Sequence, residues 1–252
     1  MKKLMVVVAA MAAVNAFGVQ GTLVREVGGE VSGDIKWQPV GKKYVVTKGN
    51  ISLEVQLADV VGYKIDEPPT FAKAREQVEN GQGSAAVNAL KKIVDDYKML
   101  QWDNKAGRWL ARAYLDAGKV QEANDLCKAI IRDDKTAAYR GDLAYSYWQT
   151  MLRLGKSAEL EKLLEKAAAS GDRASSAAAL VMRGDIILES SGNAPEKVKQ
   201  ALRDGYLRVY LMYRDAECAE VRKEACEKAA QAFEKIGRTL QAQKIRDEAK
   251  AM

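Results

Sequence analysis

Four glycines recur at a constant spacing of 37 residues through most of the chain, and this period constrains the fold more than any other feature. They are Gly81, Gly118, Gly155 and Gly192. Glycine commonly follows the last residue of a helix, because it adopts the left-handed backbone conformation without steric cost. A helix-ending signal at a fixed period predicts repeats, each a pair of helices, that must stack to cover their apolar faces.

The residues around these glycines support the helix-pair interpretation. Small or apolar side chains recur five and nine residues after the glycine, at Ala86, Ala123, Leu160, Leu90, Cys127 and Leu164. A second set lies four and eight residues before it, at Tyr114, Met151, Leu188, Leu110, Tyr147 and Gly184. Spacings near four keep each set on one helical face. We therefore expect the first set to face inward from the second helix of each pair, and the second set to form the seam of the first helix.

The pattern predicts ten helices in five pairs over residues 68–252. Their expected ranges are 70–80, 84–97, 103–117, 120–132, 136–154, 157–169, 174–190, 195–213, 218–236 and 239–250. Stacked pairs leave a concave groove lined by the first helix of each pair. We expect a partner to bind in that groove.

One repeat carries a family resemblance. The stretch 109–123, WLARAYLDAGKVQEA, resembles the tetratricopeptide (TPR) pattern of leucine, small residue, tyrosine, turn glycine and buried alanine. Segments 206–213 and 229–238 are similar to exported cell-envelope TPR proteins of the Tol-Pal-associated and outer-membrane-assembly kind. The unit departs from the family in its length of 37 rather than 34 residues, in lacking the proline near each repeat end, and in Lys197 and Ala201, which stand where apolar residues are expected. The resemblance implies an α-solenoid scaffold for protein–protein interaction.

A different pattern precedes Pro68-Pro69. Residues 19–66 alternate apolar and polar side chains between glycine-containing turns, which predicts strands at 22–27, 30–38, 43–47, 51–57 and 62–65. So small a sheet must curl or dock to bury its apolar face. The strand order resembles an SH3-like or Sm-like barrel, so the predicted fold is α+β, a five-stranded β barrel followed by an all-α TPR-like superhelical array. Trp37 and Tyr44 face each other across a turn, where they form either a peptide site or part of the core.

The first residues have the form of a signal peptide. Lys2 and Lys3 precede an apolar run from Leu4 to Val14, which is too short to span a bilayer of about 30 Å. We expect residues 1–16 to be removed by cleavage after Ala16, with Gly18 as the alternative. The sequence thus predicts an exported protein, periplasmic or associated with the cell envelope, soluble after cleavage and with no membrane span in the mature chain.

Composition argues against catalysis and nucleic-acid binding. The chain has no histidine, the commonest general base and metal ligand, and its net charge of +6 comes from lysine and arginine interleaved with acids. Its three cysteines are expected to be buried free thiols, and its paired aspartates fall at helix ends. We expect no catalytic residues, no metal and no cofactor.

The TPR groove positions are ten and six residues before the turn glycine. They are Arg108 and Arg112, then Tyr145 and Gln149, then Met182 and Ile186. Each pair shares one helix face, and a peptide with an acidic end would suit this surface. Equally, the arginines could pair with nearby acids and the last two residues could be core. The expected partner is a protein or peptide of unknown identity. The alternative is a cell-wall glycan- or peptide-binding module acting through the β barrel, with the helices as a spacer.

Overall fold

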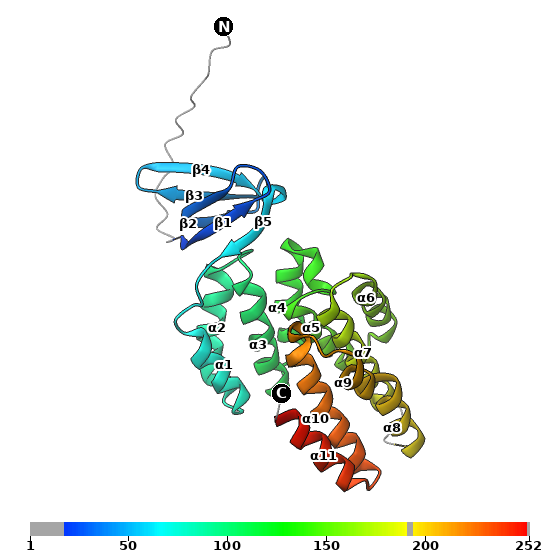
Figure 1. Ribbon diagram of the computed structural model, residues 1–252. Coiled ribbons are helices and arrows are strands. Elements are labelled where there is room, and N and C mark those ends of the chain that lie inside the picture. Colours follow the sequence, from blue (N-terminus) through cyan, green and yellow to red (C-terminus); the bar gives the residue numbers. More distant parts are fainter. Residues whose placement is uncertain (1–17, 191–193, 251–252) are drawn as a thin grey trace. The chain divides into compact units, whose positions relative to one another are not determined.

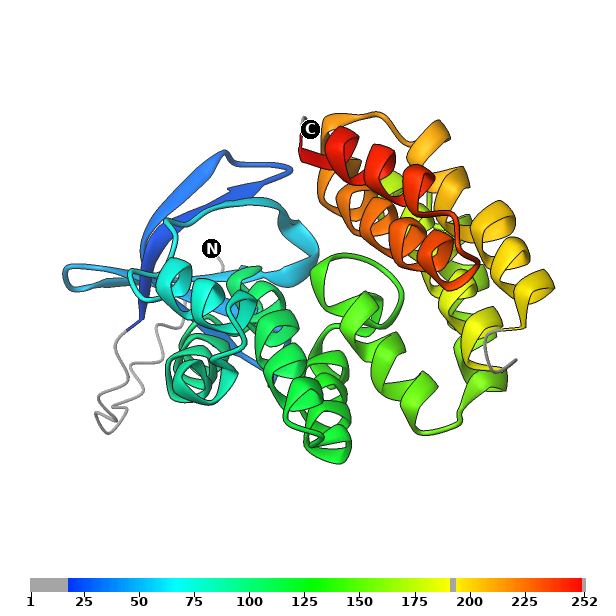
Figure 2. The ribbon, with the colours of Figure 1, turned by 90° about the horizontal axis from the view of Figure 1, so that it is seen from below.

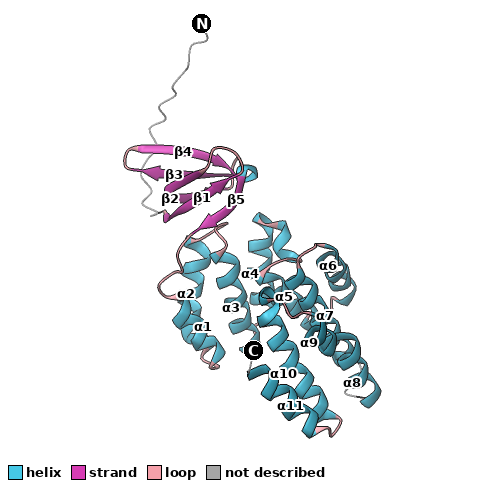
Figure 3. Cartoon of the chain, in the orientation of Figure 1, coloured by secondary structure: helices cyan, strands magenta, loops and turns pink. Residues whose placement is uncertain are grey.

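The computed structural model describes residues 18–190 and 194–250 (Figure 1). The expected signal peptide and Gly192 lie outside these residues. The chain divides into two compact units between Asp66 and Glu67. Strands occupy the first unit and helices the second (Figure 3).

The first unit is a five-stranded antiparallel sheet. Its strands are β1 Val19–Arg25, β2 Glu30–Gln38, β3 Lys43–Lys48, β4 Ile51–Gln56 and β5 Val60–Lys64. They are ordered β4-β3-β2-β1-β5, and a short 3₁₀ turn, Leu57–Asp59, joins β4 to β5. All five predicted strands are present.

The closed barrel expected from the sequence is wrong. β4 and β5 are the two ends of the strand order, and no ladder joins them within the described residues. Closure would require a fifth ladder between these edges, but each pairs on one side only, β4 with β3 and β5 with β1. The unit is therefore an open sheet.

The core of the sheet lies on one face and includes an aromatic group. Leu23, Ile35 and Tyr44 are almost completely buried. The half-buried Trp37 packs on Tyr44 with ring centroids 5.0 Å apart, and the Tyr44 and Tyr63 hydroxyls are 2.8 Å apart. Trp37 and Tyr44 thus contribute to packing.

The second unit is a series of antiparallel helix pairs (Figure 1). Its helices are α1 Phe71–Glu79, α2 Gly83–Asp96, α3 Trp102–Asp116, α4 Val120–Asp133, α5 Asp142–Arg153, α6 Ser157–Ala169, α7 Arg173–Glu189, α8 Pro195–Ala201, α9 Leu207–Met212, α10 Ala219–Lys235 and α11 Thr239–Lys250. Short helical segments cover Lys135–Ala138, Leu202–Tyr206 and Ala216–Cys218. None of the helices among the described residues is long and apolar enough to cross a membrane.

The turn glycines end helices as expected. Gly81, Gly118 and Gly155 have φ angles of +74°, +72° and +69°. After each glycine, the next amide donates to a carbonyl five residues back, as Lys119 does to Tyr114 at 2.8 Å. This is the hydrogen bond of the Schellman motif, which satisfies the last carbonyls of the helix.

Two predicted helices are interrupted. The expected helix 136–154 breaks before α5, where Gly141 has φ +81°, a conformation that a right-handed helix cannot contain. The expected helix 195–213 contains a π-helical segment, Leu202–Tyr206, between α8 and α9. With α8 and α9 counted as one interrupted helix, the array has the predicted five pairs.

The core runs through the array as successive clusters. The inward positions predicted on the second helices, such as Leu90, Cys127 and Leu164, are fully buried. Each cluster is shared by consecutive helices, from α1–α3 at one end to α7–α11 at the other. Figure 2 shows the successive helices side by side. This is the packing expected for stacked repeats.

Candidate binding cleft

The first helices of four pairs line a cleft of about 580 Å³, which we call the main cleft. Its walls are formed by the end of α1 and by α3, α5 and α10. The lining residues are Glu79, Arg108, Trp109, Arg112, Leu115, Asp116, Tyr145, Ser146, Gln149, Arg153, Glu220, Lys223, Glu224 and Glu227. Helix α10 belongs to the last pair, so the array curves enough to bring its fifth pair opposite its second.

Four of the six residues expected in the groove line this cleft. Arg108 and Arg112 contribute from α3, and Tyr145 and Gln149 from α5. Met182 and Ile186 do not. Met182 is fully buried and Ile186 is partly buried, and both pack in the core cluster between α5, α6 and α7. This face of α7 is covered, so these two residues belong to the core.

The two arginines differ in how they are held. The Arg108 guanidinium lies 2.8 Å from Glu220 on α10 and 3.9 Å from Asp142 at the start of α5. Arg112 is about half exposed, and its ion pair with Asp116 one turn further on is 3.8 Å long. Both lie near the Trp109 ring, with guanidinium carbons 5.3 and 5.4 Å from its centroid. Arg108 is therefore held within the chain, and Arg112 is more accessible to a partner.

A polar network joins α10 to α5 and α7 and includes Tyr145 of the cleft wall. Asp185 on α7 accepts hydrogen bonds from the Tyr145 hydroxyl at 3.0 Å and the Tyr206 hydroxyl at 2.7 Å. The Lys228 ammonium lies 2.9 Å from both of its carboxylate oxygens. Three donors on different elements thus compensate one largely buried carboxylate, which offsets the cost of removing its charge from water.

The α10 residues of the cleft were missed by sequence reasoning. Glu220, Glu224 and Glu227 recur at spacings of four and three, so they form an acidic stripe on one helical face. This stripe is readable from the sequence. The helices that this stripe faces are determined by the curvature of the whole array, and no local sequence pattern predicts that curvature.

A smaller cavity adjoins the main cleft, and we call it the side pocket. It has a volume of about 160 Å³ and shares Arg108, Tyr145, Glu220 and Glu224 with the main cleft. Its other lining residues are Gly141, Asp142, Ala144, Trp148, Asp172, Ala174, Ser175, Ala178, Glu217 and Val221. Burial raises the pKa of Asp142 and of Glu224 above the usual carboxyl range.

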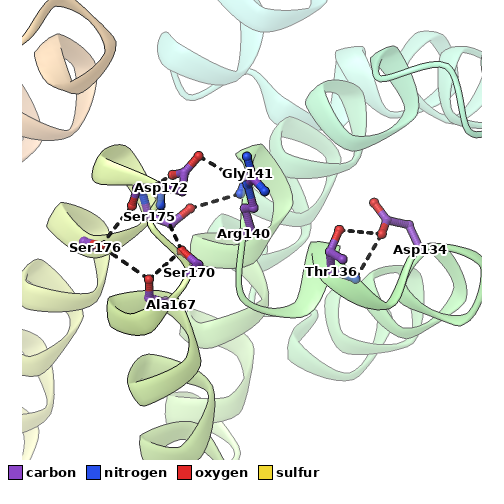
Figure 4. Close-up of polar contacts among 9 residues, drawn as sticks. All are labelled: Asp134, Thr136, Arg140, Gly141, Ala167, Ser170, Asp172, Ser175 and Ser176. Carbon is purple, nitrogen blue, oxygen red and sulfur yellow. Dashed lines mark hydrogen bonds and ion pairs between the residues drawn. The ribbon is translucent and has the colours of Figure 1, made fainter. Parts of the chain in front are cut away.

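Hydrogen bonds between two loops build one wall of the side pocket (Figure 4). Asp172 caps α7 by accepting from the Ser175 amide at 2.7 Å, and its carboxylate lies 3.4 Å from Arg140. The Gly141 amide donates to the Ser175 hydroxyl at 3.1 Å. Because these bonds join the start of α5 to the start of α7, the wall is fixed by capping interactions.

The cysteines are placed as structural thiols. Cys127, Cys218 and Cys226 are buried and unpaired. Burial raises the pKa of Cys127 to about 12, so its sulfur stays protonated at neutral pH and is a poor nucleophile. The described residues contain no group of three or more acidic, cysteine or histidine side chains arranged to hold a metal ion.

Comparisons with known proteins give structural alignments only. No family model and no curated protein sequence matches the chain. A kinesin light chain structure from Podosopora anserina with nearly identical TPR-like repeats aligns at 21% identity and a TM-score of 0.40, over 71% of this chain and 91% of that one. MamA of AMB-1 aligns at 18% identity and a TM-score of 0.35, over 73% of this chain and 96% of the other. The helix-pair architecture described above rests on the packing of this chain itself.

Proposed function

We propose that the helical unit is a protein-binding scaffold whose main cleft holds a segment of a partner protein. The observation that carries this proposal is the cleft itself, about 580 Å³ in volume and lined by the first helices of four repeats. Repeat arrays use their concave surfaces in this way. A cleft between 300 and 1,000 Å³ is typical of binding sites.

The chemistry of the lining suits a peptide segment. Gln149 offers a hydrogen-bonding group and Arg112 supplies an exposed charge. The almost fully buried Trp109 and Leu115 form apolar parts of the cleft wall. A peptide requires this mixture, because its backbone needs hydrogen-bond partners while its side chains need apolar contacts. The proposal therefore does not depend on the charge of the partner.

Site-specific cross-linking tests the cleft. A photo-reactive amino acid at Gln149 should join the chain to a partner in intact cells, while the same group at the exposed Lys162 on α6 should not. Replacing Gln149 with tryptophan should fill the cleft and reduce partner recovery at least about tenfold, and Lys162→Trp should leave it unchanged. Equal cross-linking from both positions would contradict the assignment of the cleft.

The proposed setting is the bacterial periplasm or cell envelope. It is supported by the two lysines followed by an apolar run at the start of the sequence, and by the resemblance of segments 206–213 and 229–238 to envelope TPR proteins. Chain recovered from the exported fraction should begin at Phe17 or Val19. N-terminal sequencing checks this, and material that retains Met1 in that fraction would contradict it.

The alternative function, binding of cell-wall glycan or peptide by the sheet unit, is no longer favoured. It required Trp37 and Tyr44 to form an exposed platform, whereas Tyr44 is fully buried and Trp37 packs on it. An SH3-like relationship of this unit remains a proposal, supported by its strand order and by the 3₁₀ turn between β4 and β5.

A further inference from the structure

The lining of the side pocket contains more acidic than basic side chains. Its lining includes five carboxylates, on Asp142, Asp172, Glu217, Glu220 and Glu224. The one basic side chain in the lining is Arg108. The excess is local, because the whole sequence has a net charge of +6.

Arg108 shows that this place accommodates a cation. Its guanidinium bridges carboxylates from two elements, at 2.8 Å from Glu220 and 3.9 Å from Asp142. Asp172 is also satisfied within the chain, by the Ser175 amide and by Arg140. Within the described part of the chain, Arg108 forms no ion pair with Glu217 or Glu224. At Glu224, a hydrogen bond from Tyr145 and the charges of Lys228 and Arg108 partly offset the cost of burial.

Burial makes the negative charges of Asp142 and Glu224 costly. Desolvation is the largest cause of the raised pKa of both Asp142 and Glu224. A raised carboxyl pKa means that the surroundings disfavour the ionised form. A cation brought into the pocket would lower both pKa values, and its binding is favoured to the same extent.

The shape and the walls suit a long side chain with a charged end. The partly buried Val221 and the largely buried Ala178 provide apolar wall, while Glu217 and Glu220 are exposed. A cavity of about 150 Å³ is large enough for a molecule of benzene size, and this one measures about 160 Å³. A lysine side chain has the matching form, an apolar stem that packs on such walls and an ammonium that stays near polar groups.

We propose that the side pocket receives a lysine side chain of the partner segment, and that the main cleft selects a basic segment. This assignment rests on the proposed scaffold function and adds the chemistry of the partner to it. It replaces the acidic peptide that Arg108 and Arg112 alone would suggest, because Arg108 is already paired within the chain. Arg112 lies outside the side pocket.

Two labelled peptides test the charge preference on the full chain. One alternates alanine and lysine, and the other alternates alanine and glutamate. Fluorescence anisotropy at about 0.05 M salt should show the lysine peptide binding at least about tenfold more tightly. A preference arising from the overall charge of the protein would have the opposite sign, because the chain is positive.

Matched variants locate the binding. Asp142→Asn with Glu217→Gln should weaken lysine-peptide binding about five- to tenfold, and the loss should shrink as salt is raised to about 0.3 M. Glu159→Gln with Glu165→Gln removes the same charge from exposed positions on α6 and should change binding less than about twofold. Circular dichroism of both variants checks that the helices are intact.

The outcomes separate the two proposals. Tighter binding of the glutamate peptide, binding of neither peptide, or equal losses in both double variants would overturn the lysine assignment. In those cases, cross-linking of a partner from position Gln149 would still support the scaffold function. If no partner is cross-linked from position Gln149, the scaffold function is overturned, and the lysine assignment that rests on it is overturned as well.

Discussion

Asp103 is a buried carboxyl that holds an unusual loop. Only 3% of this residue is exposed, and its carboxylate accepts hydrogen bonds from the Met99 amide at 2.7 Å and the Asn104 amide at 2.9 Å. Met99 and Gln101, in the loop before α3, have positive φ angles of 60° and 70°, which cost free energy for residues with a Cβ atom. The two hydrogen bonds keep the start of α3 and this loop in place.

The pKa of Asp103 makes stability depend on pH. Burial raises it from 3.8 to about 6, despite the opposing backbone hydrogen bonds. The folded state therefore binds the proton more tightly than the unfolded state, and stability falls as pH rises from about 4 to about 6. In the wild-type chain, this fall in the free energy of unfolding is on the order of 2–3 kcal/mol. Asp103→Asn should remove it. Urea unfolding at pH 4, 5, 6 and 7 measures it.

The control for this prediction is Asp116→Asn at the exposed end of the same helix. Its free energy of unfolding should follow the wild-type pH curve. Asp142 and Glu224 also have raised pKa values and add a decline of the same sign, so the difference between Asp103→Asn and wild type is the quantity to compare. Parallel curves for the two proteins would contradict a raised pKa at Asp103.

At the same scale, the sequence predicted part of the cleft. Arg108, Arg112, Tyr145 and Gln149 follow from their offsets to the turn glycines, which fix the face of each first helix. Met182 could have been recognised as core, because α7 is rich in small and apolar residues on all sides and so has no solvent face in its middle. The ion pair between Arg108 and Glu220 joins residues that are far apart in sequence, and only the curvature of the array brings them together.

Two glycines allow α7 to pack against the interrupted helix that follows it. A Cβ atom on Gly184 would lie 2.6 Å from the ring of Tyr206, and one on Gly205 would lie 2.9 Å from the Gly184 Cα atom. Tyr206 is almost fully buried, and its hydroxyl is bound to Asp185, so the ring has no free space to move into. The π-helical segment containing Gly205 lies at this close approach.

Gly184→Ala should therefore destabilise the array by about 1–3 kcal/mol, despite the better helix propensity of alanine. Urea unfolding followed by the circular dichroism signal of the helices measures this loss as a lower midpoint. Glu189→Ala, at the exposed end of α7, is the control and should change stability by no more than about 0.5 kcal/mol. A Gly184→Ala protein as stable as wild type would show that the crossing is looser than described.

Helical elements were predictable wherever their ends carry a local signal. The predicted range 84–97 became α2 at Gly83–Asp96, and 157–169 became α6 at Ser157–Ala169. Each of these helices begins just after a glycine turn, at Gly81 and Gly155. The break before α5 was missed, since apolar periodicity continued across Gly141. The π segment was missed because it depends on the crossing with α7, which is a tertiary contact.

The helical array should not unfold in one step, because the buried residues of each core cluster come from consecutive helices. Partly buried side chains such as Tyr145 and Val221 add a few contacts between helices that are not consecutive. The tryptophans allow this to be measured. Trp102 and Trp109 lie on α3 and Trp148 on α5, while Trp37 is in the sheet. In a Trp37→Phe background, fluorescence reports the first three helix pairs, and far-ultraviolet circular dichroism reports all helices. The two urea transitions should not coincide.

Gly184→Ala in that background sharpens the test, because it weakens the last two pairs, which contain no tryptophan. The circular dichroism transition should begin at lower urea, while the fluorescence transition should move less. The ion pair between Arg108 and Glu220 works against this separation, since it ties the second pair to the fifth across the main cleft. Removing it with Arg108→Gln should widen the gap between the two transitions. If the transitions coincide in all of these variants, the array unfolds as one cooperative unit. Contacts across the main cleft must then couple the second and fifth helix pairs as strongly as adjacent pairs are coupled.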